Sequence, residues 1–134
     1  AFRKVPVHPT LIRLGLLDHL EQQRRLGRRR IFEDLSAGAD GYYSSPFSKW
    51  FGRFLKSVSV KRDKNAFHSF RHSFLDACRA VGVPEDARNA LVGHTDTGMA
   101  GRYGDGYKPP VLAEWMEKIS YPDLDLDHLL DRSS

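Results

Sequence analysis

The chain has 134 residues, enough for one domain with a sizeable apolar core. Hydrophobic residues make up 40% and charged residues 28%, which argues against a disordered chain, and no apolar run approaches the roughly 20 residues of a membrane span. The net charge of +4 is uneven, with 19 Lys and Arg against 11 Asp and Glu in residues 1–113 but two against six in residues 114–134. A basic body indicates a polyanion partner, although a solvated surface with chance asymmetry explains it equally well.

The first third of the chain predicts a strand and then a helix. Residues 3–8 alternate polar and apolar side chains, which is typical of a strand, and because a lone strand is unstable we expect the chain to be a fragment of a longer protein. Leucines three residues apart predict one amphipathic helix from Pro9 to about Arg25, ended by Gly27. The next apolar residues, expected to pack back on the core, are Ile31, Phe32 and Leu35.

Residues 36–46 have the composition of a loop, and a helix with an aromatic face is predicted after it. Ser45 is placed to cap that helix, with Pro46 at its first position. Spacings of three and four residues predict a core-facing side formed by Phe47, Trp50, Phe51, Phe54 and Leu55.

The second half predicts further helices. An apolar stripe from Phe67 to Val81 is followed by Gly82, and a short helix after Pro84 is closed by Gly93. A helix over 111–119 and a short amphipathic segment around 126–130 complete the chain, with Trp115 and Met116 expected to line the core. The fold class is therefore mainly α, with a remnant β-strand at the N-terminus.

Three short motifs carry the candidate chemistry. His68 and Arg71 are three apart, so on a helix they project from one face, where an imidazole and a guanidinium can grip a phosphate. His94 follows Gly93 directly after a short helix, and Tyr103 lies among glycines nine residues further on. A tyrosine needs cationic neighbours and a proton acceptor to become a nucleophile at neutral pH. Each motif alone is a weak signal, and for His68 and Arg71 alone an ordinary helix surface is the more common explanation.

Together, the lines FHSFRHSFLDACRAVGV, ARNALVGHTD and AGRYGDGY resemble the tyrosine recombinase (phage integrase) family. The family pattern is HxxR, then a Gly-His pair, then a tyrosine nine positions after that histidine. The resemblance covers about residues 3–121. It implies that residues 1–121 are the C-terminal part of a mostly helical (α+β) catalytic domain and that residues 122–134 are an acidic tail.

The resemblance also implies an activity, which is DNA cutting and rejoining through a 3′-phosphotyrosine intermediate without metal, nucleotide or other cofactor. Tyr103 would be the nucleophile, Arg71 would bind the non-bridging phosphate oxygens, and His68 and His94 would assist by hydrogen bonding and proton transfer. Tyr107 is the rival nucleophile, four positions too far along. His72 is expected to have a structural or supporting role.

Two parts of the family pattern are absent from the sequence. The family carries another arginine on an earlier helix and a lysine in a β-hairpin, and the resemblance places both ahead of Ala1, since Lys4 is a few places too late. The isolated chain is therefore expected to be a poor catalyst.

The single cysteine, Cys78, excludes an internal disulfide and a cysteine-based metal site, and it fits a reducing compartment, expected to be the bacterial cytoplasm and nucleoid. The expected partner is double-stranded DNA. The protein is expected to form a tetramer on DNA, in which the tail packs on its own chain or on a neighbouring chain. Ten basic residues are expected to contact DNA phosphates: Arg24, Arg25, Arg28, Arg29, Arg30, Lys49, Arg53, Lys61, Arg62 and Lys64.

Two alternatives stay open. One is a degenerate, non-catalytic DNA-binding module of the same fold. The other is a basic RNA-binding domain that uses the cluster from Arg24 to Arg30.

Overall fold

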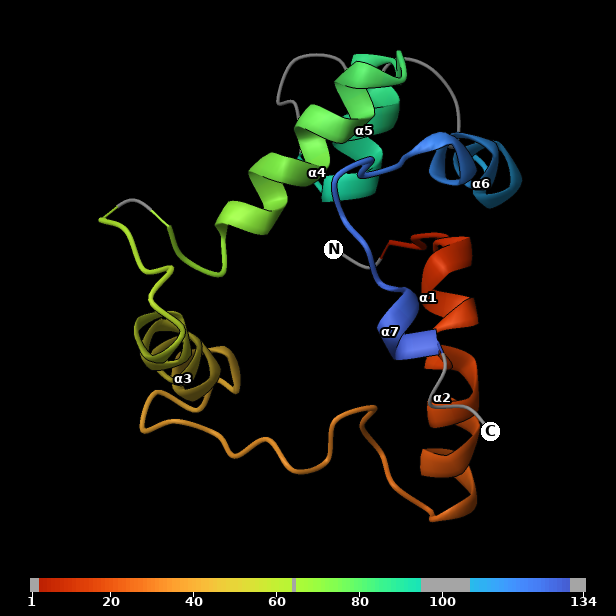
Figure 1. Cartoon of the computed structure of the whole chain (residues 1–134). Coiled ribbons are helices and arrows are strands. Elements are labelled where there is room, and N and C mark those ends of the chain that lie inside the picture. Colours follow the sequence, from red (N-terminus) through yellow and green to blue (C-terminus); the bar gives the residue numbers. More distant parts are fainter. Residues whose placement is uncertain (1–2, 64, 95–106, 131–134) are drawn as a thin grey trace. The chain divides into compact units, whose positions relative to one another are not determined.

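The computed structural model describes residues 3–63, 65–94 and 107–130, and these are mainly helical, as predicted (Figure 1). The helices are α1 (Pro9–Arg13), α2 (Leu16–Arg25), α3 (Ser44–Ser57), α4 (Ser69–Ala80), α5 (Glu85–Val92), α6 (Pro109–Lys118) and α7 (Asp127–Leu130). Among the described residues, no helix is long and apolar enough to cross a membrane.

The chain divides into two compact units. The first unit comprises residues 1–18 and 74–134, and the second unit comprises residues 19–73. Two helices, α2 and α4, each have residues in both units. The predicted division of the chain at residue 121 remains a prediction.

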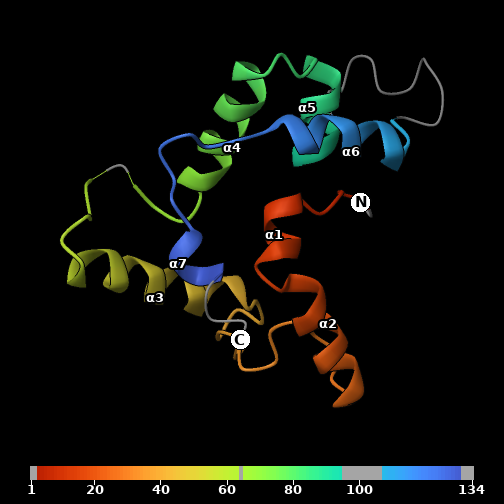
Figure 2. The same ribbon diagram turned by 45° about the vertical axis from the view of Figure 1, so that its right-hand side comes forward.

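The first unit holds the apolar core. Helices α4, α5 and α6 contribute side chains that are at most 8% exposed, and Figures 1 and 2 show α5 beside α4. The core residues are Ala77, Cys78, Val83, Ala87, Leu91, Leu112, Met116 and Ile119, and Phe74, Val81, Ala90, Tyr107 and Trp115 pack against them. The predicted core roles of Trp115 and Met116 are confirmed.

Glycines end the helices of this core where the sequence predicts. Gly82, after α4, has φ +74°, and Gly93, the C-cap of α5, has φ +71°. This left-handed backbone suits glycine because it has no Cβ. Two acidic residues, Glu85 and Asp86, occupy the first turn of α5, where they complement the helix dipole.

The N-terminal segment differs from the prediction in two ways. Residues 3–8 form no strand, because no described segment pairs with them. The predicted helix over 9–25 is broken at Gly15, whose φ of +87° ends α1 and restarts the chain as α2. His8 ties this segment to the core, since its Nδ1 accepts from the Thr10 N–H (3.1 Å) and its Nε2 donates to the Ile119 carbonyl (2.8 Å).

The described residues of the second unit form no buried apolar core, although the sequence predicted a core-facing side for the helix that begins near Ser45. Helix α3 forms as expected, but it has no buried residue, and its aromatic side chains pack on one another and on Phe67 and Phe70. The only buried side chain among the described residues of this unit is Gln23. The expectation that Ile31 and Phe32 pack back on a core is wrong, because both are exposed.

The predicted cap of α3 is also wrong. The helix begins at Ser44 and no side chain caps it. The Ser45 hydroxyl instead donates to Asp40, and this hydrogen bond, followed by that from the Tyr42 N–H, lowers the pKa of the Asp40 carboxyl.

Candidate functional site

His68 and Arg71 lie together at the start of α4. The Ser69 hydroxyl accepts a hydrogen bond from the Ala66 N–H (3.0 Å), and the Arg71 N–H donates to the His68 carbonyl (3.0 Å), so the first turn of the helix is fixed around both residues. The predicted helical spacing thus holds, except that His68 immediately precedes the helix instead of lying within it. His68 is exposed and Arg71 is partly exposed.

The start of α4 is electropositive. Its first turn carries Arg71 and His72 but no acidic residue. The N–H groups of Ser69, Phe70 and Arg71 donate to the carbonyls of Ala66, Phe67 and His68, so the positive charge at this helix start comes from the side chains. Neither the Arg71 guanidinium nor the His68 ring makes a side-chain hydrogen bond or ion pair within the described part of the chain. The pair can therefore accept an oxyanion without first breaking another polar contact.

His72 touches His68. Their rings lie edge to face, with 5.4 Å between centroids. His72 is exposed, and this contact is compatible with the supporting role predicted for it because it restricts the orientation of the His68 ring.

His94 is held by the end of α5. The N–H groups of Gly93 (2.8 Å) and His94 (3.0 Å) both donate to the Asn89 carbonyl, and the His94 side chain is exposed. The Arg3 guanidinium lies against Gly93, where the Cζ atom would be 2.7 Å from an added Cβ. Sequence analysis did not assign a role to Arg3. The one available signal was Gly93 itself, because a glycine often occurs where a side chain approaches the backbone closely.

Of the two candidate nucleophiles, Tyr103 lies outside the described residues. Tyr107 is described, and its hydroxyl donates a hydrogen bond to Asp86. That hydrogen bond, with partial burial and the charge of Asp86, raises the pKa of Tyr107. A phenol with a raised pKa is harder to ionise, which makes Tyr107 less suited to act as a nucleophile at neutral pH.

The structure thus places His68 beside Arg71 in the second unit, and Arg3 beside Gly93 and its neighbour His94 in the first unit.

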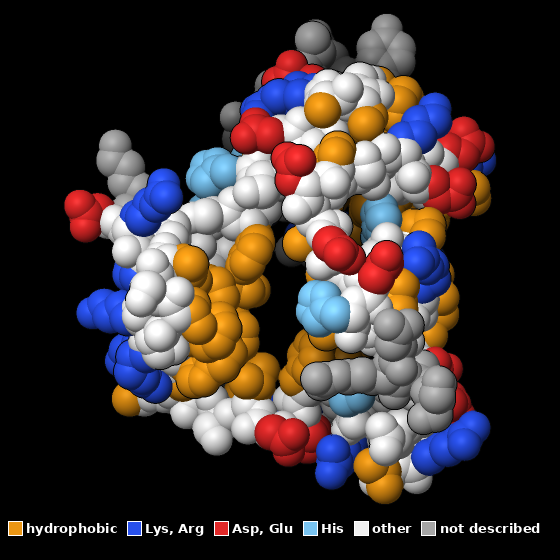
Figure 3. Space-filling view, in the orientation of Figure 1, with side chains coloured by type: hydrophobic (Ala, Val, Ile, Leu, Met, Phe, Trp, Pro, Cys, Tyr) orange, Lys and Arg blue, Asp and Glu red, His pale blue; other side chains and the backbone are white. Residues whose placement is uncertain are grey.

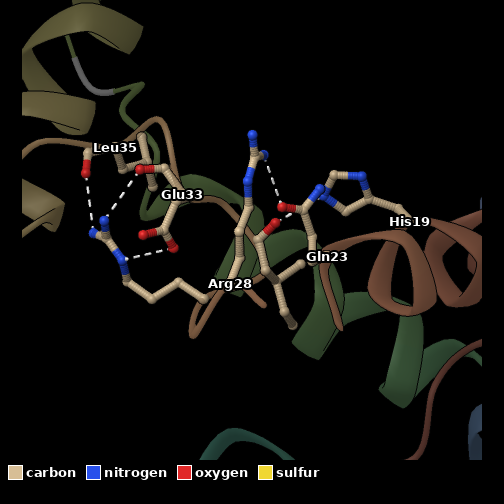
Figure 4. A network of polar contacts seen from close by, with 7 residues as sticks. His19, Gln23, Arg28, Glu33 and Leu35 are labelled. Carbon is tan, nitrogen blue, oxygen red and sulfur yellow. Dashed lines mark hydrogen bonds and ion pairs between the residues drawn. The ribbon is translucent and has the colours of Figure 1, made fainter. Parts of the chain in front are cut away.

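Some of the predicted DNA contacts have roles within the fold. The Arg30 guanidinium donates to the carbonyls of Leu35 (3.0 Å) and Glu33 (3.1 Å) and lies 4.3 Å from the Tyr43 ring centroid. Figure 4 shows the contacts with Leu35 and Glu33 and the hydrogen bond from Arg28 to Gln23 (3.0 Å). These two arginines therefore stabilise the loop after α2.

Two further basic residues are also engaged within the chain. Arg25 pairs with Glu21 (3.2 Å), and the Lys61 ammonium donates to the carbonyls of Arg62 and Asn65. Side chains without hydrogen bonds or ion pairs in the described chain are Arg24, Arg29, Lys49, Arg53 and Arg62. Lys64 lies outside the described residues.

The second unit holds the whole positive excess of the chain. It carries 12 of the 21 Lys and Arg but only five of the 17 Asp and Glu, a net charge of +7. The remaining residues carry nine basic and twelve acidic side chains, a net charge of −3. This separation is sharper than the one seen along the sequence, and it places the electrostatic attraction for a polyanion on residues 19–73.

The described residues contain no group of three or more His, Cys, Asp or Glu side chains that could hold a metal ion. Comparisons with protein-family models, with curated proteins and with solved structures find no match to this chain.

Proposed function

We propose that this chain is part of a site-specific DNA recombinase that cuts and rejoins duplex DNA through a 3′-phosphotyrosine intermediate. The sequence resemblance provides the reaction. The observation that carries the proposal is that His68 and Arg71 lie one turn apart at the start of α4, whose first turn has no acidic side chain. A guanidinium and an imidazole on adjoining turns suit a phosphodiester.

In the proposed reaction, the Tyr103 oxygen attacks a backbone phosphorus. A Tyr–O–P bond forms, the bond from phosphorus to the 5′ oxygen breaks, and the leaving strand ends in a 5′-hydroxyl. Arg71 stabilises the negative charge that builds up on the non-bridging oxygens. His68 and His94 hydrogen-bond the phosphate or move the protons that leave Tyr103 and reach the 5′ oxygen. Attack by another strand's 5′-hydroxyl reverses these bonds and releases Tyr103.

The second unit provides the electrostatic attraction to DNA in this proposal. Its net charge of +7 and its unpaired cationic side chains favour contacts with phosphates, which are sequence-neutral and weaken as salt rises. Arg28 and Arg30 contribute less, because their guanidinium groups are engaged within the fold.

We further propose that Arg3, against Gly93, supplies positive charge close to His94. The same proposal includes self-association on DNA, with the acidic tail after residue 121 packed on its own chain or on a neighbouring chain. It also includes a location in the bacterial cytoplasm and nucleoid.

The test compares Arg71→Ala with Arg79→Ala in the full-length protein that carries this sequence. Arg79 lies in the last turn of the same helix and pairs with Asp76, so it controls for loss of an arginine from α4. The probe is a pool of nicked duplexes with randomised central base pairs. We expect Arg71→Ala to lower strand cleavage at least 100-fold, in the range typical for loss of one oxyanion donor, with Arg79→Ala near wild type.

Equal cleavage by the two variants would refute the role of Arg71. DNA binding without any cleavage in the unsubstituted protein would support the alternative, a degenerate DNA-binding module of the same fold.

A further inference from the structure

The second unit exposes aromatic rings along one side of α3 and at the start of α4. Trp50 is 49% exposed, Phe54 is 44% exposed and Phe70 is 59% exposed. Phe51 holds the three together, with ring centroids 6.5 Å from Trp50, 6.4 Å from Phe54 and 5.7 Å from Phe70. We call Trp50, Phe54 and Phe70 the aromatic face.

Two of these rings stack on each other. Trp50 and Phe54 are one helical turn apart, their centroids are 5.6 Å apart and their planes differ by 12°. The rings are braced from beneath, since Phe47 stacks on Phe51 and Phe67 meets both edge-on. A stacked, braced pair offers its outer π-faces to a flat ligand.

The apolar surface of this unit is aromatic in character. Nine of the chain's 15 aromatic residues (from eight Phe, two Trp and five Tyr) lie in the second unit. None of the described ones is buried. Exposed aromatic rings are also enriched at protein–protein interfaces, so the rings alone do not identify the partner.

Cationic side chains border the aromatic face. Figure 3 shows apolar side chains along one side of α3 and Lys and Arg along the other. Arg53 follows Trp50 by three residues, so the two are neighbours on the helix surface. Lys49 and Lys56 continue the basic side, and neither makes a hydrogen bond or ion pair in the described chain. A partner for this surface therefore has flat apolar groups and negative charges close together.

We propose that the aromatic face binds single-stranded DNA, with unpaired bases stacked on Trp50 and Phe54 and backbone phosphates on Arg53, Lys49 and Lys56. Stacking on aromatic rings beside a basic groove is the physical basis of sequence-tolerant single-strand binding. A duplex hides its base faces, so the rings add affinity only for unpaired strands. The choice of DNA over RNA rests on the proposed function, whereas the stacking does not.

The experiment uses the full-length protein carrying Tyr103→Phe, so that covalent chemistry plays no part, and Trp115→Phe. Of the chain's two tryptophans only Trp50 then remains, and any tryptophan elsewhere in the protein is replaced by Phe. The probe is oligothymidylate. We expect saturable quenching of Trp50 fluorescence, because a stacked base quenches the indole. Absence of quenching while the oligonucleotide is bound would overturn the proposal.

Matched variants of Phe54 separate stacking from folding. Phe54→Leu keeps an apolar side chain but removes the π-face, and Phe54→Tyr keeps the ring. We expect Phe54→Leu to weaken oligothymidylate binding about tenfold, which corresponds to the loss of roughly one stacked base, and to leave duplex binding unchanged. Phe54→Tyr should bind like the parent.

Three other results would contradict the proposal or part of it. Equal weakening of single-strand and duplex binding by Phe54→Leu would show that the face acts through folding alone. A Trp50 signal that follows protein concentration and ignores oligothymidylate would show that a second copy of the chain covers the face. Tighter binding of oligouridylate than of oligothymidylate would overturn the choice of DNA. Because the assay involves no cleavage, its outcome is independent of the cleavage test of the proposed function.

Discussion

The Tyr107 hydroxyl donates a 2.8 Å hydrogen bond to Oδ2 of Asp86, in the first turn of α5. The bond links the segment before α6 to the helix that holds His94. It also stabilises the neutral phenol, which is the wrong form for a nucleophile. The hydrogen bond therefore makes Tyr107 a poor nucleophile, and the assignment of Tyr103 stays a prediction from the spacing of the motif.

Removal of the Asp86 carboxylate should lower the pKa of Tyr107. The hydrogen bond to Asp86, burial and the charge of Asp86 all raise it, and Asp86→Ala removes the first and third causes. The measurement is the ¹³Cζ shift of labelled tyrosine against pH. Glu85→Ala, which removes the neighbouring acid of the same turn, is the control and should leave this pKa unchanged. An unchanged pKa in Asp86→Ala would exclude the hydrogen bond.

The same bond predicts a pH dependence of stability. Because the native pKa lies above the ordinary value near 10, the stabilising contribution is complete below about pH 10 and is lost as pH rises through the native pKa. Denaturant unfolding of the parent and of Asp86→Ala at increasing alkaline pH checks the sign. The difference between the two proteins should shrink as pH rises, and a growing difference would contradict the account.

Arg29 and Arg30 are adjacent in sequence but should respond differently to substitution. Arg29 is exposed and makes no side-chain hydrogen bond or ion pair among the described residues, so Arg29→Ala should weaken binding to duplex DNA and reduce its salt dependence by about one counterion. Arg30→Ala should mainly destabilise the protein, by about 1–3 kcal/mol, because it leaves the Leu35 and Glu33 carbonyls without their donor. DNA titration at several salt concentrations and thermal unfolding measure the two effects. Equal effects of both variants on DNA affinity would contradict this division.

The left-handed glycines of the first unit should tolerate substitution poorly. Gly82→Ala forces a Cβ into φ +74° and should cost about 1–2 kcal/mol of unfolding free energy. Gly93→Ala has the same backbone cost at φ +71°, and its Cβ would also displace the Arg3 guanidinium. Because that guanidinium ends a flexible side chain, the additional cost should be small.

The double variant Gly93→Ala, Arg3→Ala serves as the control. Chemical denaturation should show Gly82→Ala and Gly93→Ala within about 0.5 kcal/mol of each other. If Gly93→Ala proves much worse and the removal of Arg3 restores stability, the guanidinium is held more rigidly than the structure suggests.

The helices of the first unit could be predicted because local signals agree with tertiary packing there. Gly82 and Gly93 mark helix ends, and the apolar spacing around Leu112 and Met116 coincides with the buried side of α6. The break at Gly15 was missed because the leucine spacing continues through it, so periodicity alone cannot reveal a backbone that turns left-handed.

The second unit shows the limit of periodicity. The spacing of the aromatic residues in α3 correctly predicted that they share one face of the helix. Spacing does not show whether other residues cover that face, and here none of them is buried. In the candidate site, the helical proximity of His68 and Arg71 follows from their separation of three residues. The approach of Arg3 to Gly93 joins residues far apart in the chain, and no local pattern encodes it. Arg30 was predicted to contact DNA, and its hydrogen bonds to the Leu35 and Glu33 carbonyls were not foreseen. Charge alone does not distinguish a free guanidinium from one that donates to carbonyls.

The most direct test of the central claim is covalent trapping on a nicked duplex that carries the protein's own target site. The full-length protein, Tyr103→Phe and Tyr107→Phe are compared by the protein–DNA adduct that survives SDS. We predict an adduct in the parent and in Tyr107→Phe, none in Tyr103→Phe, and a nucleotide attached to Tyr103 in the peptide map. An adduct that disappears only in Tyr107→Phe would contradict the assignment of the nucleophile, and the absence of any adduct from DNA-bound parent protein would contradict the proposed recombinase chemistry itself.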